Sequence, residues 1–98
     1  MRFGLKDDDL DFIKKTILKF NTIKKTVIFG SRAKGNYKTG SDIDIAIYGE
    51  DVDFSTVSRL HAILEEESPM PYYFDIVDYT HLDKKELKEH IDRVGIII

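Results

Sequence analysis

The stretch from Asp42 to Tyr48 constrains the fold more than any other part of the sequence, because apolar and polar residues alternate along it. Three isoleucines occupy one face of the predicted strand, and Asp42 and Asp44 share the other face at a spacing of about 6.6 Å. Two ionised carboxylates at that distance repel by roughly 2 to 3 kcal/mol at an effective dielectric constant near 20. The pair therefore requires either solvent on an exposed face or a bound divalent cation.

Helices and strands alternate along the rest of the chain. Apolar side chains spaced three and four residues apart predict helices over residues 6–20, 54–64 and 82–94. Short β-branched and aromatic runs predict strands over residues 26–29, 42–48 and 73–79, with a terminal edge strand over 96–98. The length and the lack of a repeat or linker predict a single α/β domain over residues 1–98.

Composition narrows the possible partners. Lys and Arg number 15 against 18 Asp and Glu, a net charge of −3, so no basic field attracts nucleic acid or an anionic membrane. We therefore expect neither direct nucleic-acid binding nor membrane binding. The absence of cysteine excludes disulfides and thiolate metal sites, and three successive aspartates near the N-terminus are unlike a signal peptide. These features predict a cytoplasmic protein.

A glycine-serine pair directly after a predicted strand provides donors for an anion. Gly30 allows backbone N–H groups to approach closely, and Ser31 adds a hydroxyl group. A helical turn over residues 31–34 would direct further free amides to the same place. The sequence is not a P-loop, because the second glycine, Gly35, is not followed by Lys and then Ser or Thr. Phosphate donors and the acidic pair are therefore expected to face one another.

The combined pattern resembles a known signature. The run Gly30-Ser31-Arg32-Ala33-x-Gly35, followed after residues 36–40 by Ser41-Asp42-Ile43-Asp44-Ile45, is similar to that of the DNA polymerase beta-like nucleotidyltransferase superfamily. At this length the chain looks most like the minimal nucleotidyltransferases (MNT), which act as antitoxins of a HEPN-domain protein encoded beside them. The resemblance implies an α/β (α+β) fold in which a small mixed sheet packs with helices.

The resemblance also implies a set of site residues. In this superfamily a carboxylate on a later strand completes the metal site, and Asp75 stands at that place here. The catalytic and metal-binding residues that it implies are Asp42, Asp44 and Asp75, with two Mg²⁺ ions, for which Mn²⁺ could substitute. The nucleotide- and phosphate-binding residues that it implies are Gly30, Ser31, Arg32 and Ser41. For Arg32, a structural ion pair behind the loop is an equally good interpretation as phosphate binding. Asp75 would ligate one ion or accept the proton of the attacking hydroxyl group.

The acceptor is expected to come from another chain, because a chain of this length has no additional domain to bind it. The resemblance implies that the HEPN partner is the acceptor, with AMP transferred from ATP or another nucleoside triphosphate onto a tyrosine or a similar hydroxyl. Two alternatives stay open. The protein could neutralise its partner by contact alone, or it could transfer a nucleotide to a small molecule in a pocket completed by dimerisation.

Overall fold

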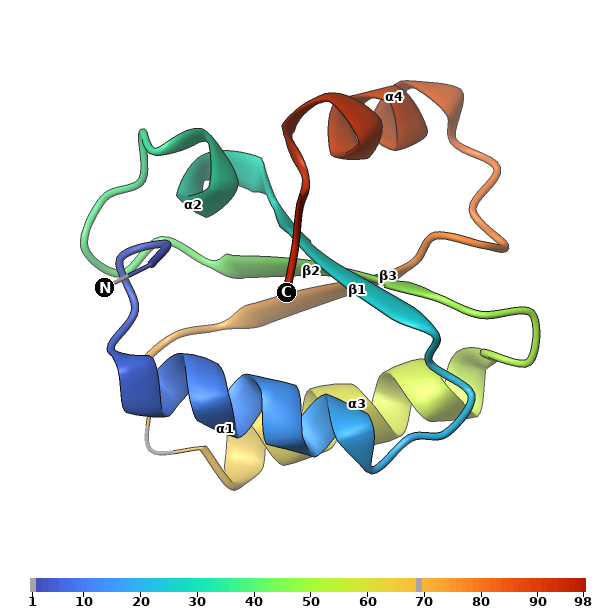
Figure 1. Cartoon of the computed structure of the whole chain (residues 1–98), viewed down its shortest axis with the longest axis horizontal. Helices are drawn as coiled ribbons and strands as arrows, with labels where there is room; N and C mark the ends of the chain where they lie inside the picture. Colours follow the sequence, from blue (N-terminus) through green and yellow to red (C-terminus); the bar gives the residue numbers. More distant parts are fainter. Residues whose placement is uncertain (1, 69) are drawn as a thin grey trace.

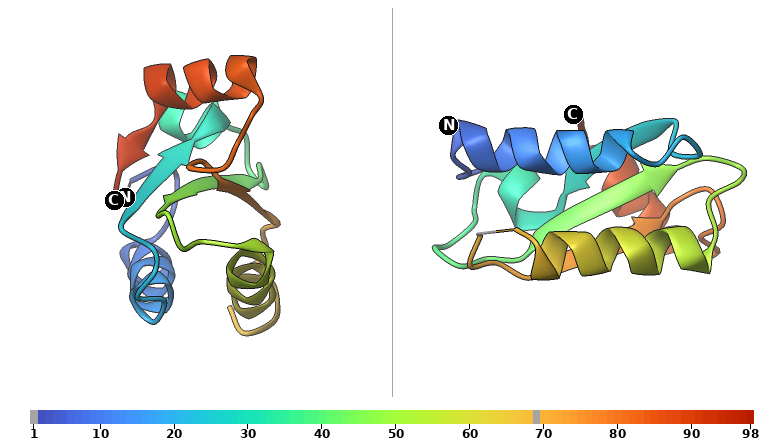
Figure 2. Two further views of the ribbon diagram at one scale, coloured as in Figure 1. Left: turned by 90° about the vertical axis from the view of Figure 1, so that its right-hand side faces the viewer. Right: turned by 90° about the horizontal axis from the view of Figure 1, so that it is seen from below.

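Residues 2–68 and 70–98, which the computed structural model describes, form a mixed sheet between two helical layers. The helices are α1 (Asp7–Leu18), α2 (Gly30–Lys34), α3 (Phe54–Glu66) and α4 (Lys85–Val94). The strands are β1 (Lys25–Phe29), β2 (Ile43–Tyr48), β3 (Phe74–Asp78) and β4 (Ile96–Ile97), in the spatial order β3-β2-β1-β4. Helices α1 and α3 cover one face of the sheet, and α2 and α4 cover the other (Figure 1, Figure 2).

The isoleucine face of β2 forms the larger core, as its alternation predicts. Ile43, Ile45 and Ile47 have no exposed surface, and they pack with apolar residues of α1 and α3, among them Ile13 and Leu60. Full burial of an aliphatic side chain of this size stabilises a fold by about 1.5 to 3 kcal/mol. This face therefore holds the sheet against its first helical layer.

The opposite face of β2 is covered as well. Ala46, on the same face as the aspartates, is fully buried in a second cluster with Val27, Phe29 and Ile91 of α4. The face that carries the acidic pair is therefore not wholly exposed, although Asp42 itself is exposed and Asp44 is only partly buried. The covered surface on this face centres on Ala46, and the beginning of β2, where the aspartates lie, is at its margin.

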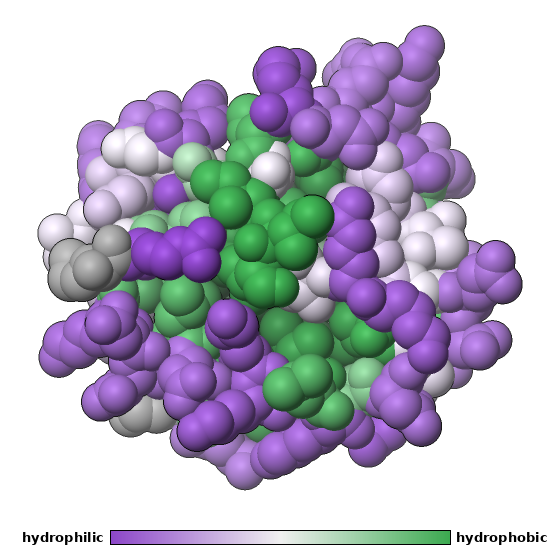
Figure 3. Space-filling model, in the orientation of Figure 1, coloured by the Kyte–Doolittle hydropathy of each residue, from purple (hydrophilic) through white to green (hydrophobic). Residues whose placement is uncertain are grey.

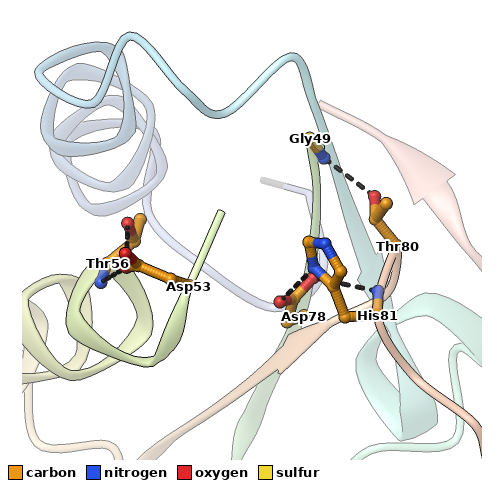
Figure 4. Close-up of polar contacts among 6 residues, drawn as sticks. All are labelled: Gly49, Asp53, Thr56, Asp78, Thr80 and His81. Atoms are coloured by element: carbon orange, nitrogen blue, oxygen red, sulfur yellow. Dashed lines mark hydrogen bonds and ion pairs between the residues drawn. The ribbon is translucent and has the colours of Figure 1, made fainter. Parts of the chain in front are cut away.

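The predicted elements all form, with small differences at their ends. The last helix begins at Lys85 rather than near Leu82, because the Leu82 N–H donates to the Tyr79 carbonyl in a turn instead. Helix α3 begins where Asp53 accepts a hydrogen bond of 2.9 Å from the Thr56 N–H, as Figure 4 shows. No helix within the described part of the chain is long and apolar enough to cross a membrane.

Strand direction places the functional segment. β1 pairs antiparallel with β2, which brings the end of β1 beside the start of β2, with Phe29 opposite Asp44. β2 and β3 are parallel, so their starts lie at the same end of the sheet, with Asp44 opposite Asp75. β4 forms the sheet edge opposite β3, and its residue Ile97 is 62% exposed. Apolar side chains gather at the centre of the face seen in Figure 3.

Candidate active site

The first turn of α2, which follows β1 without a break, lies directly against the acidic strand. Gly30 has a φ of +72°, a left-handed conformation that favours glycine. A Cβ atom added at Gly30 would collide with the Asp44 carboxylate. Only glycine therefore lets the turn and the carboxylate come this close. Ser31 follows on the turn and is partly exposed.

Three carboxylates lie at this end of the sheet. Asp44 and Asp75 are partners in the parallel register of β2 and β3, so their side chains leave the same face. Asp42 comes just before β2 and, like Asp75, is exposed, whereas Asp44 is partly buried. In the described part of the chain the ion pairs are Lys15–Asp11, His61–Glu65 and His81–Asp78, and none of them includes the three acids.

Burial and mutual repulsion strain the ionised form of the central acid. Burial, as the largest cause, and then the negative charges of Asp75 and Asp42 together raise the pKa of Asp44 from its usual 3.8 to about 6. The positive charge of Arg32 offsets part of this effect on the Asp44 pKa. The site therefore concentrates negative charge that a cation would neutralise.

The donor set fits Mg²⁺ in its chemistry. Carboxylate oxygens are the hard ligands that Mg²⁺ prefers, and this ion usually binds through one or two carboxylates together with phosphates of the substrate. Across residues 2–68 and 70–98, however, no three His, Cys, Asp or Glu side chains converge as a ready-made metal cage. The acids thus offer ligands that a nucleotide would have to complete.

Arg32 is used within the fold. Its side chain is buried, and its Nε and Nη2 groups donate hydrogen bonds of 3.0 and 2.8 Å to the Ser41 carbonyl. Nη1 donates a bond of 2.8 Å to the carbonyl of Phe3, and the guanidinium lies over the rings of Tyr72 and Tyr37. These contacts favour a structural role: Arg32 ties the N-terminal segment to the loop that enters β2, although its partners are carbonyls rather than an acid.

Ser41 shapes the same loop. Its hydroxyl oxygen accepts a hydrogen bond of 2.8 Å from the Lys38 N–H, and its own N–H donates to the Lys38 carbonyl at 3.0 Å. Ser41 thus closes a turn immediately before Asp42. These two bonds hold the residue directly before the first acid.

The sequence pattern did not assign His61 to the site. In the structure His61 and Glu65 of α3 contact the backbone of Phe74, the residue before Asp75. The signal for this contact was their i, i+4 spacing on one helix face, but the strand that they reach could not be identified from that spacing.

Asp78 lies at the other end of β3, away from the three acids. Its carboxylate contacts the His81 ring at 2.8 Å, while the nearby Thr80 hydroxyl accepts a bond from the Gly49 N–H at 2.9 Å (Figure 4). Asp78 is opposite Ile47, on the face that α1 and α3 cover. Strand alternation accounts for this placement, because Asp78 comes three residues after Asp75 and therefore lies on the opposite face of the sheet.

Comparisons with known proteins agree with this geometry. The family model described as polymerase beta, nucleotidyltransferase matches residues 11–98. A relative from Haemophilus influenzae, named "Probable protein adenylyltransferase MntA", is 35% identical over 99% of this chain and 84% of its own length.

Solved structures share the fold. A crystal structure of a toxin–antitoxin with AMP-PNP matches 95% of this chain and 72% of that chain, with a TM-score of 0.73 and 21% identity. A chain from the structure of a tri-AMPylated Shewanella oneidensis HEPN toxin in complex with MNT antitoxin also matches. The match covers 89% of this chain and 69% of the other, with a TM-score of 0.62 and 20% identity. With its sheet order, its glycine turn and its matched residues taken together, this chain belongs to the polymerase beta nucleotidyltransferase family.

Proposed function

We propose that this protein transfers AMP from ATP onto a hydroxyl group of a HEPN-domain partner and thereby acts as its antitoxin in the cytoplasm. The observation that carries the proposal is the contact between Gly30 and the Asp44 carboxylate, with Asp75 beside it in register. Phosphate donors and acidic side chains meet there, as nucleotidyl transfer requires. The relatives, a probable protein adenylyltransferase and an antitoxin in complex with an AMPylated HEPN toxin, support the same acceptor class.

Each residue of the site has a distinct proposed role. The backbone of Gly30 and the hydroxyl group of Ser31 hold the β- and γ-phosphates of the nucleotide. Asp42, Asp44 and Asp75 would hold Mg²⁺, which when bound neutralises phosphate charge and polarises the α-phosphoryl group. The acceptor oxygen then bonds to the α-phosphorus, the bond to pyrophosphate breaks, and Asp75 takes the hydroxyl proton.

Transfer to a small molecule is less well supported by the structure. A groove of about 190 Å³ within the described part of the chain is lined by residues of α1, β1, the segment between them and the chain end, among them Lys14, Ile17, Lys24 and Ile98. None of the three acids or the turn residues lines it. Around the acids, Asp42 and Asp75 are exposed, which suits an acceptor hydroxyl presented by another protein.

The test is transfer of label to the partner. The protein is incubated with the HEPN protein encoded beside it, Mg²⁺ and ATP labelled at the α-phosphate. We expect label on the HEPN protein, and we expect it to vanish with EDTA and in the double variant Asp42→Asn, Asp44→Asn. Full neutralisation of the toxin by that folded double variant, without label, would instead support neutralisation by contact alone.

A further inference from the structure

β3 is an edge strand of the sheet, and its unpaired edge begins at Phe74, the residue before Asp75. β3 pairs only with β2 among the described strands. The Ile43 N–H donates to the Tyr73 carbonyl at 2.9 Å, so alternation along β3 turns the N–H and the carbonyl of Phe74 away from β2. Backbone groups at such an edge ordinarily bind water or another strand.

Two side chains of α3 bind these backbone groups of Phe74 in place of a neighbouring strand. Glu65 Oε1 accepts a hydrogen bond of 2.8 Å from the Phe74 N–H. His61 Nε2 lies 3.1 Å from the Phe74 carbonyl, and because a carbonyl only accepts, Nε2 must carry the proton. The same nitrogen lies 3.3 Å from Glu65 Oε1. One helical turn thus presents a donor and an acceptor to both backbone groups of one residue.

Phe74 is consequently held from two directions. Its side chain is 4% exposed in the main core, and its backbone is bonded to α3. Asp75 follows it, with its side chain exposed on the opposite face of the sheet and opposite Asp44 in the register. The position of the Asp75 carboxylate therefore depends on pairing with β2 and on how firmly Phe74 is held.

We propose that His61 and Glu65 form a clamp on the edge of β3 and act as positioning residues for Asp75. The clamp removes the freedom of an edge strand at the one place where a shift would move an acid of the site. This proposal rests on the proposed function for its effect on the reaction, while the contact itself is independent of it.

Hydrogen exchange measured by NMR tests the clamp itself. In the unaltered protein, the Phe74 amide should exchange at least about tenfold more slowly than that of Ile76, which faces the same edge. In Glu65→Ala, Phe74 exchange should rise about 10- to 100-fold, because the lost bond to a carboxylate is of the charge-assisted class. Equal exchange of Phe74 and Ile76 in the unaltered protein would overturn the clamp without the need for any variant.

Matched variants test the positioning of Asp75. Glu65→Gln keeps an acceptor and His61→Gln keeps a donor, so both should retain most function, whereas Glu65→Ala and His61→Ala should not. Glu66→Ala removes a neighbouring exposed charge of α3 and serves as the control. We expect Glu65→Ala and His61→Ala to lower kcat about tenfold with the KM for ATP changed less than twofold, because the phosphate-holding turn is untouched, and we expect Glu66→Ala to leave kcat unchanged.

Binding of Mn²⁺ alone, followed by paramagnetic broadening of amide signals around Asp75, provides a readout that does not depend on transfer. The dissociation constant should rise about tenfold in Glu65→Ala and stay unchanged in Glu66→Ala. A folded Glu65→Ala variant with unaltered Mn²⁺ affinity and kcat would refute the positioning role. Mn²⁺ binding by the unaltered protein without any transfer of label would refute the proposed function instead, and the affinities would still decide the clamp.

Discussion

Replacement of Asp44 by asparagine should stabilise the protein while it abolishes the proposed function. The pKa of Asp44 is raised from 3.8 to about 6, so the folded state binds its proton more tightly than the unfolded state does. That difference corresponds to about 3 kcal/mol, at about 1.4 kcal/mol for each tenfold change in proton affinity. Because the carboxylate is partly exposed to solvent, we reduce the expected gain at pH 7.5 to about 2 kcal/mol.

The sign of the pH dependence follows from the same linkage. A carboxyl group with a raised pKa in the folded state contributes stability below pH 3.8, and that contribution is lost as the pH rises through about 6. The advantage of Asp44→Asn should therefore be complete at pH 7.5 and shrink by more than half at pH 4. Urea unfolding of both proteins without metal measures it, with the exposed Asp51→Asn as a control expected to lie within about 0.5 kcal/mol of the unaltered protein.

Ligand should reverse the order of the two proteins. Mg²⁺ and ATP at about 100 times their dissociation constant should stabilise the unaltered protein by about 2.7 kcal/mol and leave Asp44→Asn unchanged. Two results would refute the electrostatic account of this site. One is an Asp44→Asn variant that is less stable than the unaltered protein at pH 7.5, and the other is a stability advantage of the variant that is as large at pH 4 as at pH 7.5.

Three further variants test the surroundings of the acids. Gly30→Ala should lower the free energy of unfolding by more than the roughly 1 to 2 kcal/mol of left-handed strain, because its Cβ meets the Asp44 carboxylate. Gly35→Ala, with a φ of +88° and no atom within 4 Å of the added Cβ, should cost the strain alone. Urea unfolding compares the two variants, and equal losses would exclude the collision. Arg32→Met should lower the free energy of unfolding by about 2 to 4 kcal/mol and expose the segment around Phe3 to protease, because the hydrogen-bonded carbonyls lose their donor; unchanged proteolysis would contradict the structural role of Arg32.

Local sequence patterns predicted much of the fold, including the strand and the turn that carry the candidate site residues. The period of two along β2 assigned the isoleucines to the core, which their burial confirms, and assigned Asp44 to the other face, where it is the register partner of Asp75. The Gly30-Ser31 pair indicated a turn after a buried strand, and the turn is there. The differences lie at the ends of elements, as at Leu82, where a turn competes with the first helical turn for the same backbone groups.

Other features of the site depend on contacts between residues distant in the chain. Arg32 donates to Phe3 and Ser41, and no local pattern identifies two carbonyls as its partners. The helix spacing of His61 and Glu65 was visible, but the strand edge that they hold was not.

The amino-acid sequence by itself determined which residues share a face, because side-chain alternation along a strand is set by the backbone of that strand alone. It thereby placed Asp42 and Asp44 together and the isoleucines opposite them. Only the tertiary structure decided that β3 lies parallel to β2 with Asp75 opposite Asp44, and that α4 buries the rest of the acidic face. Register and layer order follow from the packing of the two cores, which involves residues far apart in the chain, so no short stretch encodes them.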